Sequence, residues 1–137
     1  VRDSYDTYHD IEITSSGIDP ETTIVADRRQ LKQVFSNLLQ NAIDAMDGNG
    51  EVRLRSDLVK KGESSYCRVQ LEDTGPGIPP ENQGEVFNPY FTTKGHGTGL
   101  GLAIVERIIF DHEGQIWFET EEGVGTTFFI DLPIEAQ

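Results

Sequence analysis

The 137-residue chain is predicted to fold as an α+β protein, a two-layer sandwich in which helices cover one face of a mixed, mostly antiparallel sheet. Two observations predict this class. Two segments show the apolar period of an amphipathic helix. The strand-like segments come in pairs and do not alternate one by one with helices. The expected order is therefore strand, strand, helix, strand, strand, glycine-rich lid, helix, strand, strand.

The N-terminal part is expected to supply a linker and two short strands. Residues 1–10 are polar and aromatic without a clear period, and we interpret them as a linker remnant. Residues 11–14 alternate and predict a strand, and residues 23–26 predict a second one. One domain is then expected over residues 11–134, followed by a tail at residues 135–137.

Residues 28–46 carry the clearest helical pattern, and Asp27 before them is a typical N-cap residue. The apolar face of this helix is predicted to hold Leu31, Val34, Phe35, Leu38, Leu39, Ala42, Ile43 and Met46. At about 100° per residue, Asn37, Asn41 and Asp44 form their own stripe on the flank of that face. We expect this stripe neither at the centre of the core nor on the fully solvated side.

Residues 51–58 and 65–73 predict a pair of strands joined by a charged turn at residues 60–63. The apolar face of the second strand is predicted to hold Cys67, Val69, Leu71 and Asp73. A carboxylate on an apolar face is costly unless hydrogen-bond donors surround it. Asp73 is therefore the first residue that needs a functional explanation.

A glycine-rich segment, residues 73–103, holds seven of the chain's 14 glycines and runs into a helix predicted at 98–111. Free N–H groups and the helix dipole make such a helix start an anion site. A flexible surface loop is the plainer alternative, since neither common nucleotide-binding glycine pattern is present. Strands at 115–120 and 126–132 are expected to close the sheet.

The composition limits the classes of function. A net charge of −13 argues against a general nucleic-acid surface, and a nucleotide would need a cation and backbone N–H groups to neutralise it. The single Cys67 excludes an internal disulfide. We find no membrane-spanning apolar run and no signal peptide, which favours a cytoplasmic domain. The chain begins without Met, and we expect it to be a piece of a longer protein.

Two polar groups are candidates for a ligand site. In Asp73-x-Gly-x-Gly77, the carboxylate can accept from an exocyclic amine such as that of adenine, while glycines let a flat ring approach. The alternative is a simple strand-ending turn. Asn37, Asn41 and Asp44 could be a solvated helix flank, or a site for Mg²⁺, which takes one or two protein oxygens plus phosphates and water.

The aromatic residues of the glycine-rich segment, Phe87, Tyr90 and Phe91, are interpreted as the anchor of a lid, with core packing as the alternative. Lys94 and His96 could then reach a terminal phosphate. None of the three histidines has a metal-ligand partner at helical spacing, and His112 is expected to be structural.

The ordered motifs resemble those of the catalytic ATP-binding domain of sensor histidine kinases, in the superfamily of DNA gyrase, the ninety-kilodalton heat-shock chaperone and MutL. NLLQNAIDA from Asn37 is similar to the N box, and DTGPG from Asp73 to the G1 box. VFNPYFTTK from Val86 is similar to the F box, and GTGLGLA from Gly97 to the G2 box. GVGT from Gly123 resembles the last glycine motif. The sequence PYFTTK at residues 89–94 is most similar to that of nitrogen-regulation-type sensor kinases.

The resemblance implies a Bergerat-type fold with a left-handed βαβ unit, and ATP and Mg²⁺ as ligands. It implies that Asp73 reads adenine, partly through a water shared with Thr126, that Asn41 binds Mg²⁺ beside Asn37, and that Lys94 approaches the phosphates. The catalytic set that the resemblance implies is Asn37, Asn41 and Lys94, with Asn37 and Asn41 as the expected metal ligands. The nucleotide-binding set that it implies is Asp73, Gly75, Gly77, Ile78, Phe87, Thr93, Lys94, Gly97, Thr98, Gly99, Leu100, Gly101 and Thr126.

One position separates branches of the superfamily. Members that hydrolyse ATP carry a Glu four residues before the Mg²⁺-binding Asn, where this chain has Asn37. The resemblance thus implies a histidine kinase that phosphorylates a separate dimerisation and phosphoacceptor domain, since no histidine here lies in the acceptor context. A response regulator would act downstream.

Two small departures from the family pattern are Asn88 and Glu113, where an acid and a glycine are common. The isolated domain is expected to be monomeric, without nucleic-acid or membrane contact, although the full-length protein can carry a membrane anchor. The alternatives are an ATPase or serine kinase of the same superfamily, and a non-catalytic module gated by nucleotide.

Overall fold

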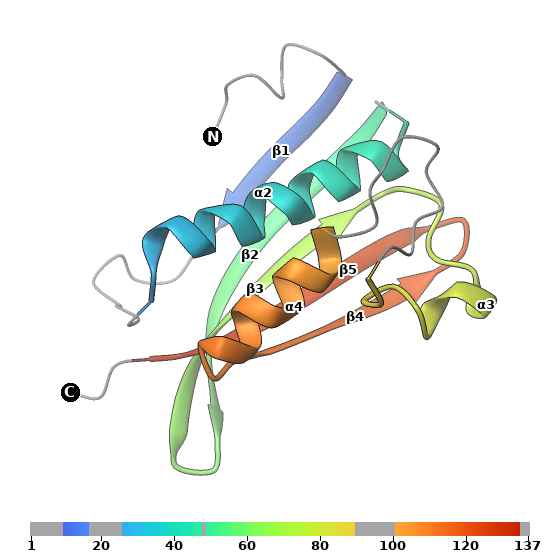
Figure 1. Ribbon diagram of the computed structural model, residues 1–137. Helices are drawn as coiled ribbons and strands as arrows, with labels where there is room; N and C mark the ends of the chain where they lie inside the picture. Colours follow the sequence, from blue (N-terminus) through green and yellow to red (C-terminus); the bar gives the residue numbers. More distant parts are fainter. Residues whose placement is uncertain (1–9, 17–25, 48, 90–100, 135–137) are drawn as a thin grey trace.

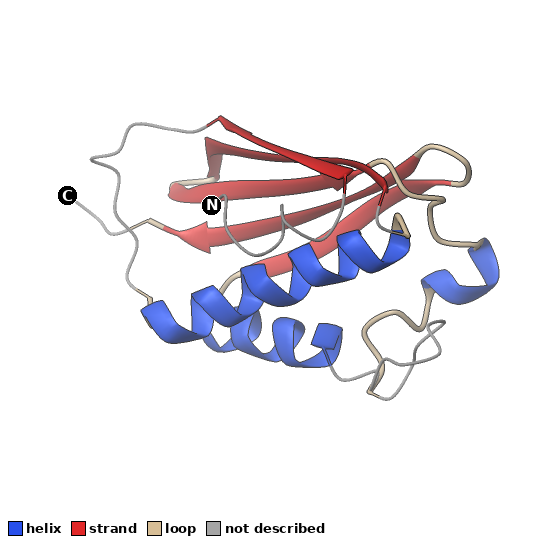
Figure 2. Ribbon diagram, turned by 90° about the horizontal axis from the view of Figure 1, so that it is seen from above, coloured by secondary structure: helices blue, strands red, loops and turns tan. Residues whose placement is uncertain are grey.

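The computed structural model describes residues 10–16, 26–47, 49–89 and 101–134, and these form a sheet with helices packed on one side (Figure 1). The strands are β1 (Asp10–Ser16), β2 (Asn49–Lys61), β3 (Ser64–Asp73), β4 (Gln115–Glu121) and β5 (Gly125–Pro133). The helices are α2 (Arg28–Ala45), α3 (Pro80–Gln83) and α4 (Gly101–Asp111). Seen from above, α2 and α4 lie on the same side of the sheet (Figure 2).

The sheet has the order β1-β2-β3-β5-β4, with β1 parallel to β2 and the other neighbours antiparallel. The predicted two-layer α+β sandwich with a mixed, mostly antiparallel sheet is therefore confirmed. The helix predicted at 28–46 is confirmed within one residue, and the later helix is confirmed over the described residues 101–111. Residues 23–25 of the second predicted strand lie outside the described residues, and Ala26 is not in a strand.

The hairpin of β2 and β3 is longer than predicted. Lys60 and Lys61, expected in a turn, pair with Ser65 and Ser64 as part of the strands. The turn shrinks to residues 62–63. Backbone pairing satisfies N–H and C=O groups whatever the side chains, so a polar stretch that lacks apolar alternation can still extend a hairpin.

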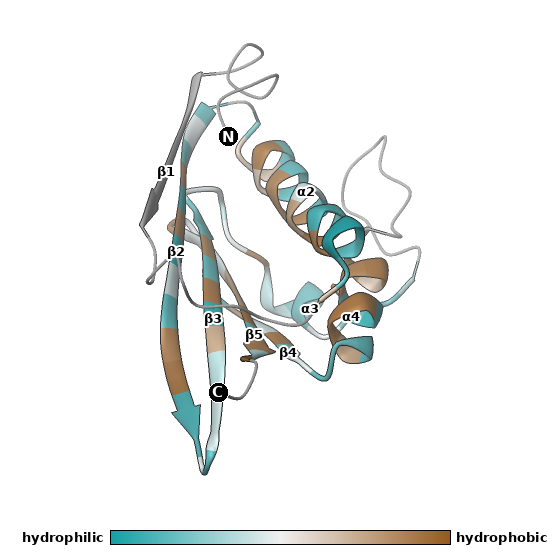
Figure 3. Cartoon of the chain, turned by 90° about the vertical axis from the view of Figure 1, so that its left-hand side faces the viewer, coloured by the Kyte–Doolittle hydropathy of each residue, from teal (hydrophilic) through white to brown (hydrophobic). Residues whose placement is uncertain are grey.

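The core lies between α2, α4 and the sheet (Figure 3). On α2 the buried positions are Val34, Leu38, Ala42 and Ile43, the face predicted from the apolar period. Asp27 caps this helix, since its carboxylate accepts from the N–H of Gln30 at 3.0 Å. Within the described part of the chain, no helix is both long and apolar enough to cross a membrane.

His112 joins the two long helices, which confirms its predicted structural role. Its Nε2 accepts from the N–H of Asp27 at 3.0 Å, at the start of α2. Its Nδ1 lies 2.8 Å from the carbonyl of Ile108 in α4 and donates to it. These two contacts require the neutral ring with its proton on Nδ1.

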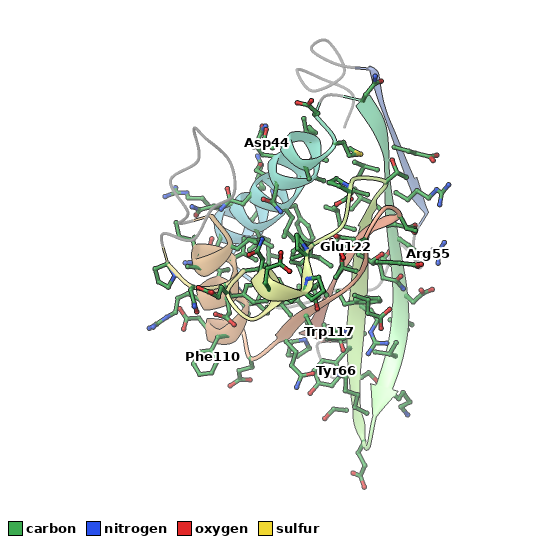
Figure 4. All side chains as sticks on the ribbon, turned by 90° about the vertical axis from the view of Figure 1, so that its right-hand side faces the viewer. Asp44, Arg55, Tyr66, Phe110, Trp117 and Glu122 are labelled. Atoms are coloured by element: carbon green, nitrogen blue, oxygen red, sulfur yellow. The ribbon has the colours of Figure 1, made fainter. Side chains whose placement is uncertain are left out.

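The face of the sheet away from the helices carries a small polar and aromatic cluster. Asp131 is fully buried there, because Arg68 (Nε–Oδ1 2.8 Å) and Lys61 (Nζ–Oδ2 2.6 Å) cover it. Trp117 stacks on Phe129 with ring centroids 5.2 Å apart, and the Arg68 guanidinium lies 5.0 Å from the Trp117 ring. The Lys61 Nζ lies 4.8 Å from the centroid of the Tyr66 ring and 5.7 Å from that of the Trp117 ring, and Phe110 projects from α4 (Figure 4).

Candidate functional site

Asp73, the last residue of β3, lies on the helix-covered face as the alternation of β3 predicts, and it is only 6% exposed. Its Oδ1 accepts from the backbone N–H of Gly75 at 2.8 Å and of Thr126 at 3.3 Å. Burial raises the pKa of this carboxyl group, and the two backbone donors offset part of that rise. Both of these hydrogen bonds reach Oδ1, so Oδ2 is the oxygen that can meet a ligand.

Asp73 belongs to a row of three polar side chains that crosses β3, β5 and β4. The register pairs Asp73 with Thr126 and Thr126 with Thr120, so all three lie on one face. The Thr120 and Thr126 hydroxyl oxygens are 2.9 Å apart, and Thr120 also accepts from the N–H of Ile78 at 2.9 Å. The sequence reasoning missed Thr120. A register counted outward from the Gly123 turn would have placed it opposite Thr126.

The loop after Asp73 is held between the end of α2 and the turn from β4 to β5. A Cβ on Gly75 would lie 3.1 Å from Asp73 Oδ1 and 3.4 Å from Met46 Cγ. Gly77 has φ +81°, and a Cβ there would lie 2.5 Å from the carbonyl oxygen of Glu121. The fold itself thus requires glycine at position 77, and a role for Gly77 in ligand binding stays a prediction.

The stripe of Asn37, Asn41 and Asp44 is half-buried, as predicted for a helix flank. Asn37 Nδ2 lies 3.4 Å from the carbonyl oxygen of Gly101, at the start of α4. Met46, the C-cap residue of α2, follows Asn37 by nine residues, which is roughly 14 Å along the helix axis at 1.5 Å per residue. Met46 contacts the loop of Gly75. The end of α2 therefore contacts the loop that follows Asp73, and Asn37 of the stripe contacts the first turn of α4.

The first turn of α4 contains no acidic side chain, so nothing there opposes an anion at this helix end. Gly101 is the one member of the predicted phosphate loop that the structure describes. The other residues predicted to bind the nucleotide in this segment, Thr93, Lys94, Gly97, Thr98, Gly99 and Leu100, lie outside the described residues. Their roles stay predictions.

Phe87 packs at the edge of the core, with its ring centroid 6.1 Å from that of Phe118 and 6.3 Å from that of Phe128. It thereby fixes the segment after α3 to β4 and β5, which suits both the core and the anchor interpretation. Its contact with a ligand stays a prediction, and Tyr90 and Phe91 lie outside the described residues.

The donor set of the stripe fits Mg²⁺ better than a metal that prefers nitrogen or sulfur. No group of three or more His, Cys, Asp or Glu side chains forms a metal cage among the described residues. Mg²⁺ needs only one or two protein oxygens when substrate phosphates and water supply the rest. Because Asn37 uses its amide nitrogen toward Gly101, its carbonyl oxygen remains the atom suited to a cation.

A hollow lies apart from this site. It is a groove of about 400 Å³ between α4 and β4, lined by Glu106, Ile109, Phe110, Gly114, Gln115, Ile116 and Trp117. None of the residues predicted to bind nucleotide lines it. We assign it no ligand.

Comparison with known proteins agrees with the geometry. Residues 26–136 match the family described as histidine kinase-, DNA gyrase B- and HSP90-like ATPases. The chain is 43% identical over 114 residues to the signal transduction histidine-protein kinase AtoS of Escherichia coli, covering 83% of this chain and 18% of AtoS. It is 40% identical over 120 residues to the sensory histidine kinase/phosphatase NtrB of Rhodobacter capsulatus, covering 80% and 33%.

Among solved structures, the nucleotide-free catalytic domain of histidine kinase ThkA has a TM-score of 0.78 at 39% identity, covering 90% of this chain and 79% of that one. ThkA has also been solved in complex with the response regulator protein TrrA, with a TM-score of 0.70 at 35% identity, covering 90% and 34%. The chain spans a third or less of the length of AtoS and NtrB. The chain therefore belongs to the histidine kinase-, DNA gyrase B- and HSP90-like ATPase family, as an ATP-binding domain of the sensor histidine kinase branch.

Proposed function

We propose that this domain binds Mg-ATP and transfers the γ-phosphoryl group to a histidine on a separate dimerisation and phosphoacceptor domain, in cytoplasmic two-component signalling. A response regulator would receive the phosphoryl group next. The observation that carries the proposal is the buried carboxylate of Asp73. It has one oxygen fixed by two backbone donors, and its loop contacts the end of α2, the helix whose Asn37 contacts the start of α4.

Asp73 is suited to bind the 6-amino group of adenine. An ionised carboxylate only accepts hydrogen bonds, and the amine donates. Because Asp73 is buried, an amine that pairs with it relieves part of the cost of an isolated charge. Thr126, next to Asp73 in the row, would hold a water or the base edge beside it.

The triphosphate would extend along α2 toward α4. The first-turn N–H groups of α4 and the neighbouring glycine backbone would bind phosphate oxygens, helped by Lys94. Asn41, with Asn37 beside it, would hold Mg²⁺, which neutralises phosphate charge when it is bound. Amide oxygens make this contact without adding negative charge to a domain whose net charge is already −13.

Asn37 favours transfer over hydrolysis. A carboxamide does not take a proton from water at physiological pH, so Asn37 cannot act as the general base. Phosphoryl transfer depends mostly on positioning and charge neutralisation. The lone pair of a neutral imidazole nitrogen would form the N–P bond, while the bond from the γ-phosphorus to the bridging oxygen breaks and its electrons leave on ADP.

The test uses ATP labelled at the γ-phosphate and a phosphoacceptor domain supplied as a separate protein. We expect acid-labile, base-stable label on an acceptor histidine and little phosphate released by the domain alone. Asn41→Ala should lower transfer at least 100-fold, about 2.7 kcal/mol of lost transition-state stabilisation. Gln33→Ala, an exposed amide on the same helix, is the matched control and should transfer normally.

The other outcomes identify the rival functions. Steady phosphate release without labelled acceptor would contradict transfer and show an ATPase. Nucleotide binding without either product would show a module that nucleotide only gates.

A further inference from the structure

Among the described residues, the Thr120 hydroxyl has three polar neighbours, and their chemistry indicates where its proton points. The N–H of Ile78 lies 2.9 Å away and can only donate. The carbonyl oxygen of Gly125 lies 3.2 Å away and can only accept. The Thr126 hydroxyl, 2.9 Å away, can do either.

A hydroxyl donates one hydrogen bond and accepts two. All three contacts are hydrogen bonds at once only if Thr120 donates to Gly125 and accepts from both Ile78 and Thr126. In any other arrangement one contact is lost, in a place where Thr126 is only 6% exposed. The geometry therefore favours Thr126 donating its proton to Thr120.

This direction of the hydrogen bonds determines whether the Thr126 hydroxyl can donate to a ligand or only accept from it. With its proton directed at Thr120, the Thr126 oxygen presents only lone pairs. Asp73, its neighbour across β3 and β5, also presents only an acceptor when ionised. This end of the row is therefore built of acceptors and complements a ligand edge that carries N–H donors.

We propose that Thr120 is a positioning residue that holds Thr126 as an acceptor and thereby helps the site select a 6-aminopurine over a 6-oxopurine nucleotide. This rests on the proposed function, because it assumes that the purine lies against Asp73. With the 6-position of the purine held against Asp73, a 6-amino group donates to such a surface, whereas a 6-oxo group in the same place meets only acceptors. The donors of guanine, N1–H and the 2-amino group, would face Asp73 only if the ring shifted. Without Thr120 as its acceptor, the Thr126 hydroxyl can rotate and donate to a 6-oxo group.

The test compares Mg-ADP and Mg-GDP binding by calorimetry in the wild type, Thr120→Val and Thr120→Ser. Valine keeps the shape of threonine without the hydroxyl, and serine keeps the hydroxyl. We expect the wild type to bind ADP more tightly than GDP. In Thr120→Val the ratio of ADP affinity to GDP affinity should fall about tenfold, which corresponds to the free energy of one hydrogen bond. Thr120→Ser should keep the wild-type ratio. An unchanged ratio in Thr120→Val, with ADP still bound by the wild type, overturns this inference alone.

A double-mutant cycle of Thr120→Val and Thr126→Val distinguishes a role of Thr120 in positioning Thr126 from a general loosening of the fold. Since Thr120 acts through Thr126, Thr120→Val should not change the ratio further once Thr126 is valine. Equal narrowing in both backgrounds would overturn the inference. If Thr120→Val does not fold, Thr126→Val alone decides, because removing the Thr126 acceptor must also narrow the ratio.

Hydrogen exchange of the backbone amides tests the hydrogen bonds of Thr120 without any nucleotide. The Ile78 amide should exchange faster in Thr120→Val than in the wild type, and as slowly as the wild type in Thr120→Ser. Unchanged protection in Thr120→Val would contradict the network itself. A wild type that binds neither nucleotide would overturn the proposed function and this inference together.

Discussion

Replacing Asp73 by Asn should weaken nucleotide binding strongly while leaving the nucleotide-free fold more stable. Asparagine has nearly the same shape, and its carbonyl oxygen can still accept from the backbone N–H groups of Gly75 and Thr126. Its NH₂ then takes the place of Oδ2 and opposes the adenine amine, donor against donor. The charge-assisted hydrogen bond, worth about 1.5–3 kcal/mol, is lost, and two desolvated donors remain unpaired. A total near 3 kcal/mol corresponds to binding at least about 100-fold weaker.

The same substitution, Asp73→Asn, should raise the stability of the nucleotide-free domain. Burial raises the pKa of Asp73, so the ionised carboxylate opposes folding near neutral pH. The folded state then holds its proton more tightly than the unfolded state. Stability linked to Asp73 is full below the ordinary carboxyl pKa and is lost as the pH rises through the raised folded value. At pH 7, Asp73→Asn should therefore unfold at a higher temperature, and the difference should shrink as the pH falls through that window.

Two assays check this pair of effects. Calorimetric titration with Mg-ADP gives the affinities, and thermal unfolding without nucleotide gives the stabilities. Wild-type affinity should also fall as the pH drops through the raised pKa of Asp73, because only the ionised form accepts from the amine. Equal ADP affinity in both proteins would refute the role of Asp73 in reading adenine. A variant clearly less stable than the wild type at pH 7 would refute the reasoning about its burial.

Two further predictions concern stability. Asp131→Asn should lower the free energy of unfolding by about 2 kcal/mol in urea titrations, less than for a fully buried pair because Arg68 and Lys61 remain about a third exposed. Burial alone would raise the pKa of Asp131, but hydrogen bonds from Arg68 and Lys61 outweigh it and lower the pKa. The loss in the free energy of unfolding should therefore persist at neutral pH and fade as the pH falls from the ordinary carboxyl range through the lowered pKa. A loss that does not depend on pH would argue against the ion pairs. Glu113→Gly should raise the melting temperature by about 3–5 °C, because Glu113, two residues beyond the end of α4, has φ 62°, a conformation that costs a residue with a Cβ about 1 kcal/mol. No increase in the melting temperature would show that this backbone is not strained.

Local sequence rules predicted the parts of the fold that local contacts determine. The apolar period of α2 gave its buried face, and the alternation along β3 gave the side on which Asp73 lies. Both follow from the geometry of a single helix or strand. The half-buried stripe of Asn37 and Asn41 follows from the same helical period.

Features that depend on pairing between strands distant in the sequence could not be predicted from the sequence. Thr120 lies beside Thr126 only through the register of β4 and β5. The requirement for glycine at position 77 comes from a carbonyl 44 residues away, that of Glu121. The cover of Asp131 by Lys61 and Arg68 joins three strands. Hydropathy along one segment carries no information about such contacts.

The most direct test of the central claim is to map Mg-ADP binding with the backbone and side-chain amide signals of the protein in solution. We predict the largest shifts at the amides of Gly75 and Ile78 and at the side-chain amides of Asn37 and Asn41. The signal of Trp117, in the groove between α4 and β4, should not change. That result would place the nucleotide between the Asp73 loop and α2. Shifts centred on Trp117, or none at saturating Mg-ADP, would contradict the account.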